Sequence, residues 1–147
     1  MDFLSSLSIS SSGLTAQRVR MDLISSNLAN VNSTQTEAGG PYRRKEPVFQ
    51  SVPVDESFRS LYDKQLNLPD KINRVQVVDI VENPKDFRMQ YNPNHPQADK
   101  DGYVAMPNVN VVEEMANMIE ANRSFEANVA VISTTKSMAM KALSISQ

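Results

Sequence analysis

One short segment has the residue types of a cation-binding loop. In the segment DKDG, at residues 99–102, aligning Gly102 with the sixth position of a calcium loop places Asp99 and Asp101 at the third and fifth positions. The first position would then be Gln97 and the twelfth Asn108, although a calcium loop needs an acidic residue at both. A turn is therefore the better interpretation, and no metal site is predicted.

The only histidine, His95, lies in the segment NPNHPQ and has no base, orienting acid or nucleophile near it in the sequence. A loop position is favoured over a catalytic or metal-binding role. The chain contains no cysteine, no G-x-S-x-G nucleophile elbow and no glycine-rich phosphate-binding motif. We therefore predict no catalytic residue, no cofactor-binding residue and no cofactor, and do not expect an enzyme.

Charge does not favour nucleic acid as a partner. The net charge of the 147 residues is −2, and the basic run Arg43-Arg44-Lys45 is followed directly by Glu46. No aromatic pattern or basic helix surrounds this run, so a solvated strand end or a subunit contact is favoured.

Membrane insertion is not expected either, because no run approaches the ~18–20 apolar residues of a membrane span. The first residues, MDFLSSLSISSSGL, contain an acid and frequent serines, which is unlike a secretory signal. We expect a cytoplasmic chain or one exported without a cleaved signal.

The longest pattern is a helix predicted from Asn110 to about Leu143. This stretch contains no glycine or proline, and its apolar residues recur every three or four positions. At ~1.5 Å per residue the helix is roughly 50 Å long. Asn110 is a good N-cap, with Glu113 as the acid of a capping box. Such a helix cannot cover its own apolar stripe, and residues 129–140 hold a single charge, so contact on more than one side is expected.

The methionines of this segment, including Met138 and Met140, recur at helical spacing and could suggest copper binding or an adaptable groove. Packing is the favoured interpretation, because methionine fills irregular gaps.

A second helix is predicted over residues 3–31. Leu7, Leu14, Met21 and Leu28 follow one another at intervals of seven, and serine and glutamine occupy part of the neighbouring row. This leucine-rich row is the expected partner of the C-terminal helix. Asn30, Asn32 and Ser33 then end the helix.

All eight prolines and three of the four glycines lie in the middle of the chain. Short alternating runs predict strands at 42–49, 74–81, 87–91 and 102–106, with irregular connections at 51–71 and 92–100 and a possible helix at 56–65. The predicted fold is α+β: long N- and C-terminal helices paired as an antiparallel coiled coil, with a small β-rich inserted domain. The predicted boundaries are 1–33 for the first helix, 34–108 for the insert and 109–147 for the second helix.

Both ends resemble a known family. The segment 13–34 begins Gly13-Leu14-x-Ala16 and ends Ser26-Asn27-Leu28-Ala29-Asn30 with Thr34 nearby, similar to the start of bacterial flagellar rod, hook and hook-associated proteins. The C-terminal box at 123–128 resembles their R-x-[YF]-E-A-N pattern, with Phe125 in place of the common tyrosine. Segments 41–49 and 91–110 narrow the resemblance to the short proximal-rod members.

The resemblance implies a structural subunit of the bacterial flagellar basal-body rod, a drive-shaft that transmits motor torque across the periplasm. It implies export through the flagellar type III apparatus without a cleaved signal peptide. The implied partners are copies of the chain and other rod proteins: the proximal rod, the distal rod and the basal-body adaptor. A cytoplasmic coiled-coil adaptor or secretion chaperone remains the alternative. The predicted assembly interface consists of helix residues: Leu7, Leu14, Met21, Ile24, Asn27, Leu28, Asn30, Met115, Met118, Ile119, Arg123, Phe125, Asn128, Val129, Ile132 and Leu143.

Overall fold

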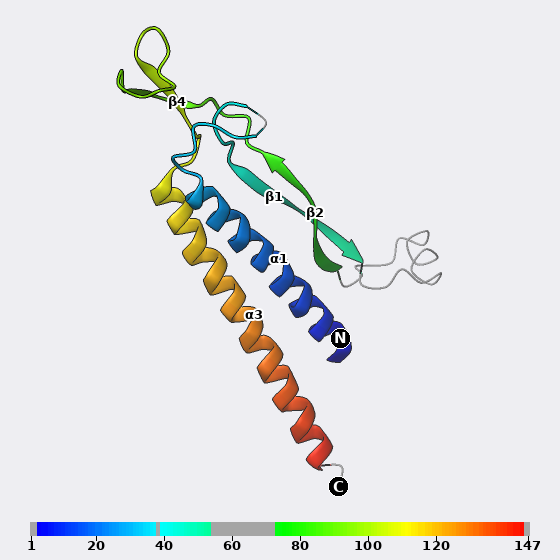
Figure 1. Cartoon of the computed structure of the whole chain (residues 1–147). Helices are drawn as coiled ribbons and strands as arrows, with labels where there is room; N and C mark the ends of the chain where they lie inside the picture. Colours follow the sequence, from blue (N-terminus) through cyan, green and yellow to red (C-terminus); the bar gives the residue numbers. More distant parts are fainter. Residues whose placement is uncertain (1–2, 38, 54–72, 146–147) are drawn as a thin grey trace, which may run out of the picture.

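The computed structural model describes residues 3–37, 39–53 and 73–145, which form two long helices and two small sheets (Figure 1). Helix α1 spans Phe3–Ala29 and helix α3 spans Val111–Ile145. Strands β1 (Lys45–Pro53) and β2 (Asn73–Glu82) form one antiparallel sheet, and β3 (Arg88–Tyr91) and β4 (Tyr103–Met106) form the other. The α+β class and both long helices are confirmed.

Helix α1 ends in a turn that is held by hydrogen bonds of Asn30 and Ser33. The Asn30 side-chain amide donates to the Ser26 carbonyl oxygen at 2.9 Å, and the Ser33 hydroxyl donates to Asn30 Oδ1 at 3.1 Å. The backbone N–H of Val31 also donates to the Leu28 carbonyl oxygen, and that of Ser33 donates to the Asn30 carbonyl oxygen; both satisfy carbonyl groups that the end of a helix leaves without an internal partner. The predicted end at Asn30–Ser33 is thus close to the observed one.

Helix α3 begins with the predicted cap. The backbone N–H of Val112 donates to Asn110 Oδ1 at 3.1 Å, which satisfies one of the free donors of the first turn. Glu113, however, makes no return bond to the Asn110 backbone in the described part of the chain. The capping box is therefore only half formed.

The two helices pack side by side and antiparallel, as three contacts spaced by seven residues of α1 establish (Figure 1). Asn27 bonds Glu114, Arg20 pairs with Glu120, and Gly13 lies against Asn128. A Cβ atom at Gly13 would lie 3.0 Å from the Asn128 amide nitrogen, so the glycine permits a close approach. The supercoiling of a true coiled coil stays a prediction.

The β1–β2 hairpin lies along α1, on the side marked by Ser12, whose hydroxyl accepts a bond from the Val75 backbone N–H at 3.2 Å. Its register shifts by a bulge between Val48 and Phe49. The strand predicted at 42–49 in fact begins at Lys45, because the Tyr42 and Arg44 side chains turn into the helix pair, where they bond Asn27 and Glu114. The possible helix at 56–65, and residues 54–71 of the predicted irregular connection, lie outside the described residues.

The β3–β4 hairpin is joined by the turns predicted at 92–102. Gly102 has a φ of +80°, and a Cβ there would lie 2.9 Å from the Tyr91 ring, so glycine suits this turn on both counts. The Tyr91 and Tyr103 rings meet edge to face with their centroids 5.4 Å apart. His95 sits in a turn and its Nδ1 accepts a bond from the Gln97 backbone, which agrees with a loop position.

The core of the described chain is small. Its buried apolar side chains are Ala16, Ile24, Tyr42, Val104, Val109 and Ala121. Many larger apolar side chains stay exposed, including three of the four methionines on α3: Met115, Met138 and Met140. The expectation that methionine packs is therefore not met within the single chain. Neither long helix has a segment of sufficient length and hydropathy to cross a membrane, judged over the residues described.

Candidate functional site

A cluster of polar side chains joins α1, α3 and the start of the β1–β2 hairpin. This polar junction consists of Asn27 on α1, Glu114 on α3, and Tyr42, Arg44 and Lys45 from the insert. Asn27 is 1% exposed and Glu114 is 0% exposed, so both polar groups have left water. Buried groups of this kind are costly unless their hydrogen bonds are replaced, and here they are replaced.

Asn27 makes every hydrogen bond that a side-chain amide offers. Its Nδ2 donates to the Lys45 carbonyl oxygen at 3.0 Å and to Glu114 Oε2 at 3.1 Å. Its Oδ1 accepts from the Lys45 backbone N–H at 2.9 Å and from the Tyr42 hydroxyl at 3.0 Å. The Asn27 side chain of α1 thus bonds both helix α3, through Glu114, and Lys45, the first residue of β1.

Glu114 supplies the charge at the centre of the junction. Arg44 Nε donates to Glu114 Oε1 at 2.6 Å, and the same guanidinium also bonds Glu46. The Arg44 side chain is 17% exposed, so its charge is largely removed from water and depends on these carboxylates.

A second asparagine fixes the backbone of the same segment. Asn108 Oδ1 accepts from the Arg44 backbone N–H at 2.8 Å, and its Nδ2 donates to the carbonyl oxygens of Asn83 and Lys85. Glu46 in turn accepts a bond from the Asn83 amide at 2.7 Å. The insert is therefore attached to the helix pair by directional bonds rather than by a large apolar contact.

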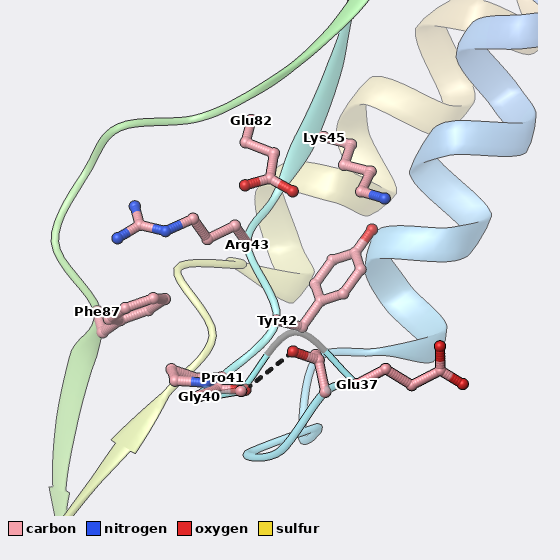
Figure 2. Close-up of a pocket in the computed structure, with 10 residues that line it drawn as sticks. Glu37, Gly40, Pro41, Tyr42, Arg43, Lys45, Glu82 and Phe87 are labelled. Atoms are coloured by element: carbon pink, nitrogen blue, oxygen red, sulfur yellow. Dashed lines mark hydrogen bonds between the residues drawn. The ribbon is translucent and has the colours of Figure 1, made fainter.

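Beside the junction, the insert has a hollow of about 500 Å³, which Figure 2 shows in close-up. The Arg43 guanidinium lies 4.4 Å from the centre of the Phe87 ring, and the Thr36 hydroxyl donates to the Gly40 carbonyl oxygen. Acids and bases both line it, but no nucleophile–base pair does. No cluster of three or more metal-binding side chains occurs in the part of the chain that the structure describes.

Helix α3 carries an exposed apolar row that its partner helix leaves uncovered. Ile119 is 56% exposed, Leu143 is 70% exposed, and other members of the row are similarly open to solvent. The row consists of Val112, Met115, Ile119, Val129, Met140 and Leu143. Four members of this row belong to the predicted interface: Met115, Ile119, Val129 and Leu143.

The sequence predicts that the leucine-rich row of α1 lies at the centre of the helix contact. In the structure it lies beside that centre. The contacting row is Gly13, Arg20 and Asn27, and the leucine-rich row follows it by one residue. Leu7, Leu14, Met21 and Leu28 are each only half-buried. Ser10, a weakly polar residue of the neighbouring row, is more deeply buried than they are, whereas Gln17 of that row is also half-buried.

These two apolar rows share one side of the helix pair. On α3, Met115 and Val129 follow the contacting residues Glu114 and Asn128 by one residue, as Leu14 follows Gly13 on α1. One residue is a rotation of about 100° in the same sense on each helix. Because the helices are antiparallel, equal rotations carry both rows to the same side.

This side faces away from the hairpin, since Ser12, which contacts β2, lies about 200° around α1 from Leu14. We call the combined surface the apolar side. It consists of Leu7, Leu14, Met21 and Leu28 of α1 with the exposed row of α3.

The other predicted interface residues divide by position. Ile24 and Asn27 are buried within the chain, and Arg123 is exposed. The remainder are half-buried: Asn30, Met118, Phe125, Asn128 and Ile132. Among the described residues, α1 is the element that packs against helix α3, so the second contact expected at residues 129–140 is not made by the described part of the chain.

Sequence reasoning did not predict that Tyr42, Arg44 and Glu114 meet at the polar junction. Of the two interpretations of the basic run, the solvated strand end is wrong for Arg44, which is held against Glu114, and the subunit contact stays a prediction. One signal was present: Glu114, Ala121, Asn128 and Thr135 recur every seven residues, so an acid stands in the row that faces α1. A charge at such a position calls for a buried partner.

Two family models match the chain at its two ends. The model described as "Flagella basal body rod protein" matches residues 7–35, and the model described as "Flagellar basal body rod FlgEFG protein C-terminal" matches residues 100–145. Together they cover most of both helices and the β4 strand. The resemblance of the two termini to flagellar axial proteins is confirmed.

Relatives match over the full length. The chain is 42% identical to flagellar basal-body rod protein FlgC of Borreliella burgdorferi, over 100% of this chain and 99% of the relative. It is 46% identical to the Bacillus subtilis FlgC over 95% of each chain, and 40% identical to the FlgC of Escherichia coli O6:H1 over 100% of each. The chain therefore belongs to the FlgC family of flagellar basal-body rod proteins, and it is a structural protein of the rod.

Proposed function

We propose that this rod subunit assembles by burying the apolar side of its helix pair against copies of itself and against neighbouring rod proteins. The observation that carries the proposal is the position of the two apolar rows, which share one side of the pair and leave the hairpin on another. Apolar rows aligned on two helices form one strip, and exposed strips of this kind mark interaction sites.

The free energy of assembly then comes largely from burial of this strip. Burial of apolar area contributes ~25 cal/mol per Å², and most of it would be gained between subunits because the chain's own core is small. Asn122 and Glu126 interrupt the row on α3 and provide polar positions that can select one register of the partner.

The last turns of α3 support the same proposal. They extend past the beginning of α1, as Figure 1 shows, and carry Met138, Met140 and Leu143 exposed to solvent. No described segment of the chain covers these side chains. A neighbouring subunit along the rod axis is the partner that we propose for them.

The wider role follows from the family. We extend the proposal to a rod that spans the periplasm and transmits motor torque, with the proximal rod, the distal rod and the basal-body adaptor as neighbours. Delivery through the flagellar type III export apparatus, without a cleaved signal, belongs to the same proposal. The alternative of a cytoplasmic adaptor or secretion chaperone has no support among the relatives, whose names are those of rod proteins.

Substituting Ile119→Asp tests the proposal, since it places a charge in the exposed row while leaving the fold of the monomer intact. Val131→Asp is the matched control, because Val131 is an exposed aliphatic residue of the same helix but lies about 100° around it from Glu114 in the sense opposite to the apolar row. We expect Ile119→Asp to abolish incorporation into purified basal bodies and motility, with Leu14→Asp acting in the same way. Normal incorporation of both Ile119→Asp and Leu14→Asp would refute the proposed surface.

A further inference from the structure

We propose that the polar junction is a positioning device: it fixes the axial register of α1 against α3 and the direction in which the β1–β2 hairpin leaves the pair. The proposal deepens the assembly role above. Only its consequence for the rod rests on that role. Neighbouring subunits would meet the apolar side and the hairpin in one fixed relation, because the junction holds both.

The apolar contact between the helices is poorly suited to defining a register. The contacting row of α1 includes Gly13, and Ser10 and Ala16 are the side chains buried beside it. Small side chains give an apolar seam few features that distinguish one alignment from another, so the polar contacts carry more of that preference.

The sevenfold spacing adds a specific ambiguity. The contacting residues Gly13, Arg20 and Asn27 are spaced by seven residues, and so are Glu114, Ala121, Asn128 and Thr135 on α3. Sliding one helix by seven residues, about 10 Å, brings similar rows into contact again. The shifted pair would lack the bond between Asn27 and Glu114, so this polar contact separates the observed alignment from the shifted one.

The junction also orients the hairpin. Asn27 binds both the backbone N–H and the carbonyl oxygen of Lys45, which is the first residue of β1. Arg44, one residue earlier, reaches across to Glu114 on the other helix. Two successive residues are thus tied to two different helices, and the strand that follows has one direction available to it.

Replacing the charged pair by apolar side chains separates a positioning role from a purely stabilising one. Buried ion pairs can often be exchanged for apolar residues without loss of stability, whereas uniqueness of structure is the property that polar contacts supply in several systems. The variant is Arg44→Met with Glu114→Leu. The matched control is Arg20→Met with Glu120→Leu, which makes the same exchange at the solvent-accessible ion pair between the same helices.

The chain contains no cysteine, so pairs of spin labels can be introduced cleanly at exposed positions. Labels at Ser11 and Ala116 report the register of the helices, and labels at Gln50 and Lys136 report the direction of the hairpin. Distances are measured by pulsed electron paramagnetic resonance on the purified, dilute full chain, with the unfolding midpoint recorded in parallel.

We expect one narrow distance for each label pair in the parent and in the control. In the Arg44→Met/Glu114→Leu variant we expect an additional register distance shifted by about 10 Å and a broadened hairpin distance, with the unfolding midpoint unchanged or higher. Narrow, parent-like distances in that variant would overturn the proposal.

If the double variant does not fold, the Arg44→Lys variant tests the proposal instead. It keeps the positive charge but lacks the planar guanidinium that bonds Glu114 and Glu46 together. A broadened hairpin distance in Arg44→Lys supports the proposal, and a single parent-like hairpin distance overturns it. Because these measurements use monomer, their outcome is independent of whether Ile119→Asp blocks incorporation.

Discussion

The two ends of the helix pair differ in where their side chains find partners. At the junction end, Asn27 and Glu114 are almost wholly buried and every bond of the Asn27 amide is made within the chain. At the other end, Leu4, Met140 and Leu143 are exposed, and α3 continues past the start of α1 (Figure 1).

The two ends therefore have different proposed roles: the junction end fixes the shape of the subunit, and the open end contacts its neighbours. Directional polar bonds complete the junction end inside one subunit, so its geometry does not depend on neighbours. The open end presents apolar area, which has little directional preference and gains stability only when another surface covers it. A subunit of this design holds its shape at one end and acquires its remaining stability from assembly at the other.

The largest expected effect on stability comes from a substitution that disrupts the junction end. Glu114→Leu removes the carboxylate that Arg44 and Asn27 both contact, and leaves a mostly buried guanidinium with less compensation. Breaking a buried pair by removing one partner costs roughly 3–5 kcal/mol. We expect the free energy of unfolding of the purified chain to fall by about this amount in denaturant titrations.

Glu113→Leu is the matched control for this prediction. Glu113 is the neighbouring acid in the same first turn of α3 and is exposed, so its loss removes a similar interaction with the helix dipole but no buried bond. We expect a change within about 0.5 kcal/mol. Equal destabilisation by the two variants would show that the dipole, and not the junction, gives Glu114 its importance.

The sequence was sufficient for the parts of the fold that depend on local pattern. Apolar spacing and the Asn110 cap located both long helices, and alternation located all four strands to within a few residues. The end of α1 followed from Asn30, Asn32 and Ser33, of which Asn30 and Ser33 bond one another in the turn after the helix. Such features are encoded within a few residues, and no long-range contact is needed to find them.

The junction and the rotation of α1 could not be predicted in this way. Tyr42, Arg44 and Glu114 lie up to 72 positions apart in numbering, and only the folded chain brings them together. The apolar repeat predicts the leucine-rich row as the seam, yet the helices approach closely at Gly13 and the neighbouring, more polar row faces α3. Packing distance, rather than hydropathy, decided which row faces α3.

A smaller effect is expected midway between the two ends. Gly13→Leu places a bulky side chain where a Cβ atom alone would already lie 3.0 Å from the Asn128 side chain. Overpacking of this kind typically costs ~1–3 kcal/mol, because neighbouring side chains or backbone must move. We expect a lower unfolding midpoint together with a wider helix spacing, measured between spin labels on α1 and α3.

Ser11→Leu is the control for helix propensity, since Ser11 is exposed on the same turn of α1. Leucine forms helix more readily than either glycine or serine, so propensity alone would stabilise both variants. A Gly13→Leu chain at least as stable as Ser11→Leu would contradict the close-approach explanation and would show that the helices tolerate separation at this level.

The smallest effect should come from the second ion pair between the same helices. Arg20 and Glu120 lie 3.3 Å apart, but the Glu120 side chain is 65% exposed, so water already solvates its charge. Exposed pairs contribute about 0–1 kcal/mol and are screened by salt, whereas a buried pair is screened much less. We therefore expect Glu120→Gln to shift the free energy of unfolding by less than about 0.5 kcal/mol at moderate salt. Raising the salt concentration should remove even this difference, while the deficit of Glu114→Leu should persist. If Glu120→Gln and Glu114→Leu instead responded alike to salt, the burial of the junction would not be what separates the two ends of the helix pair.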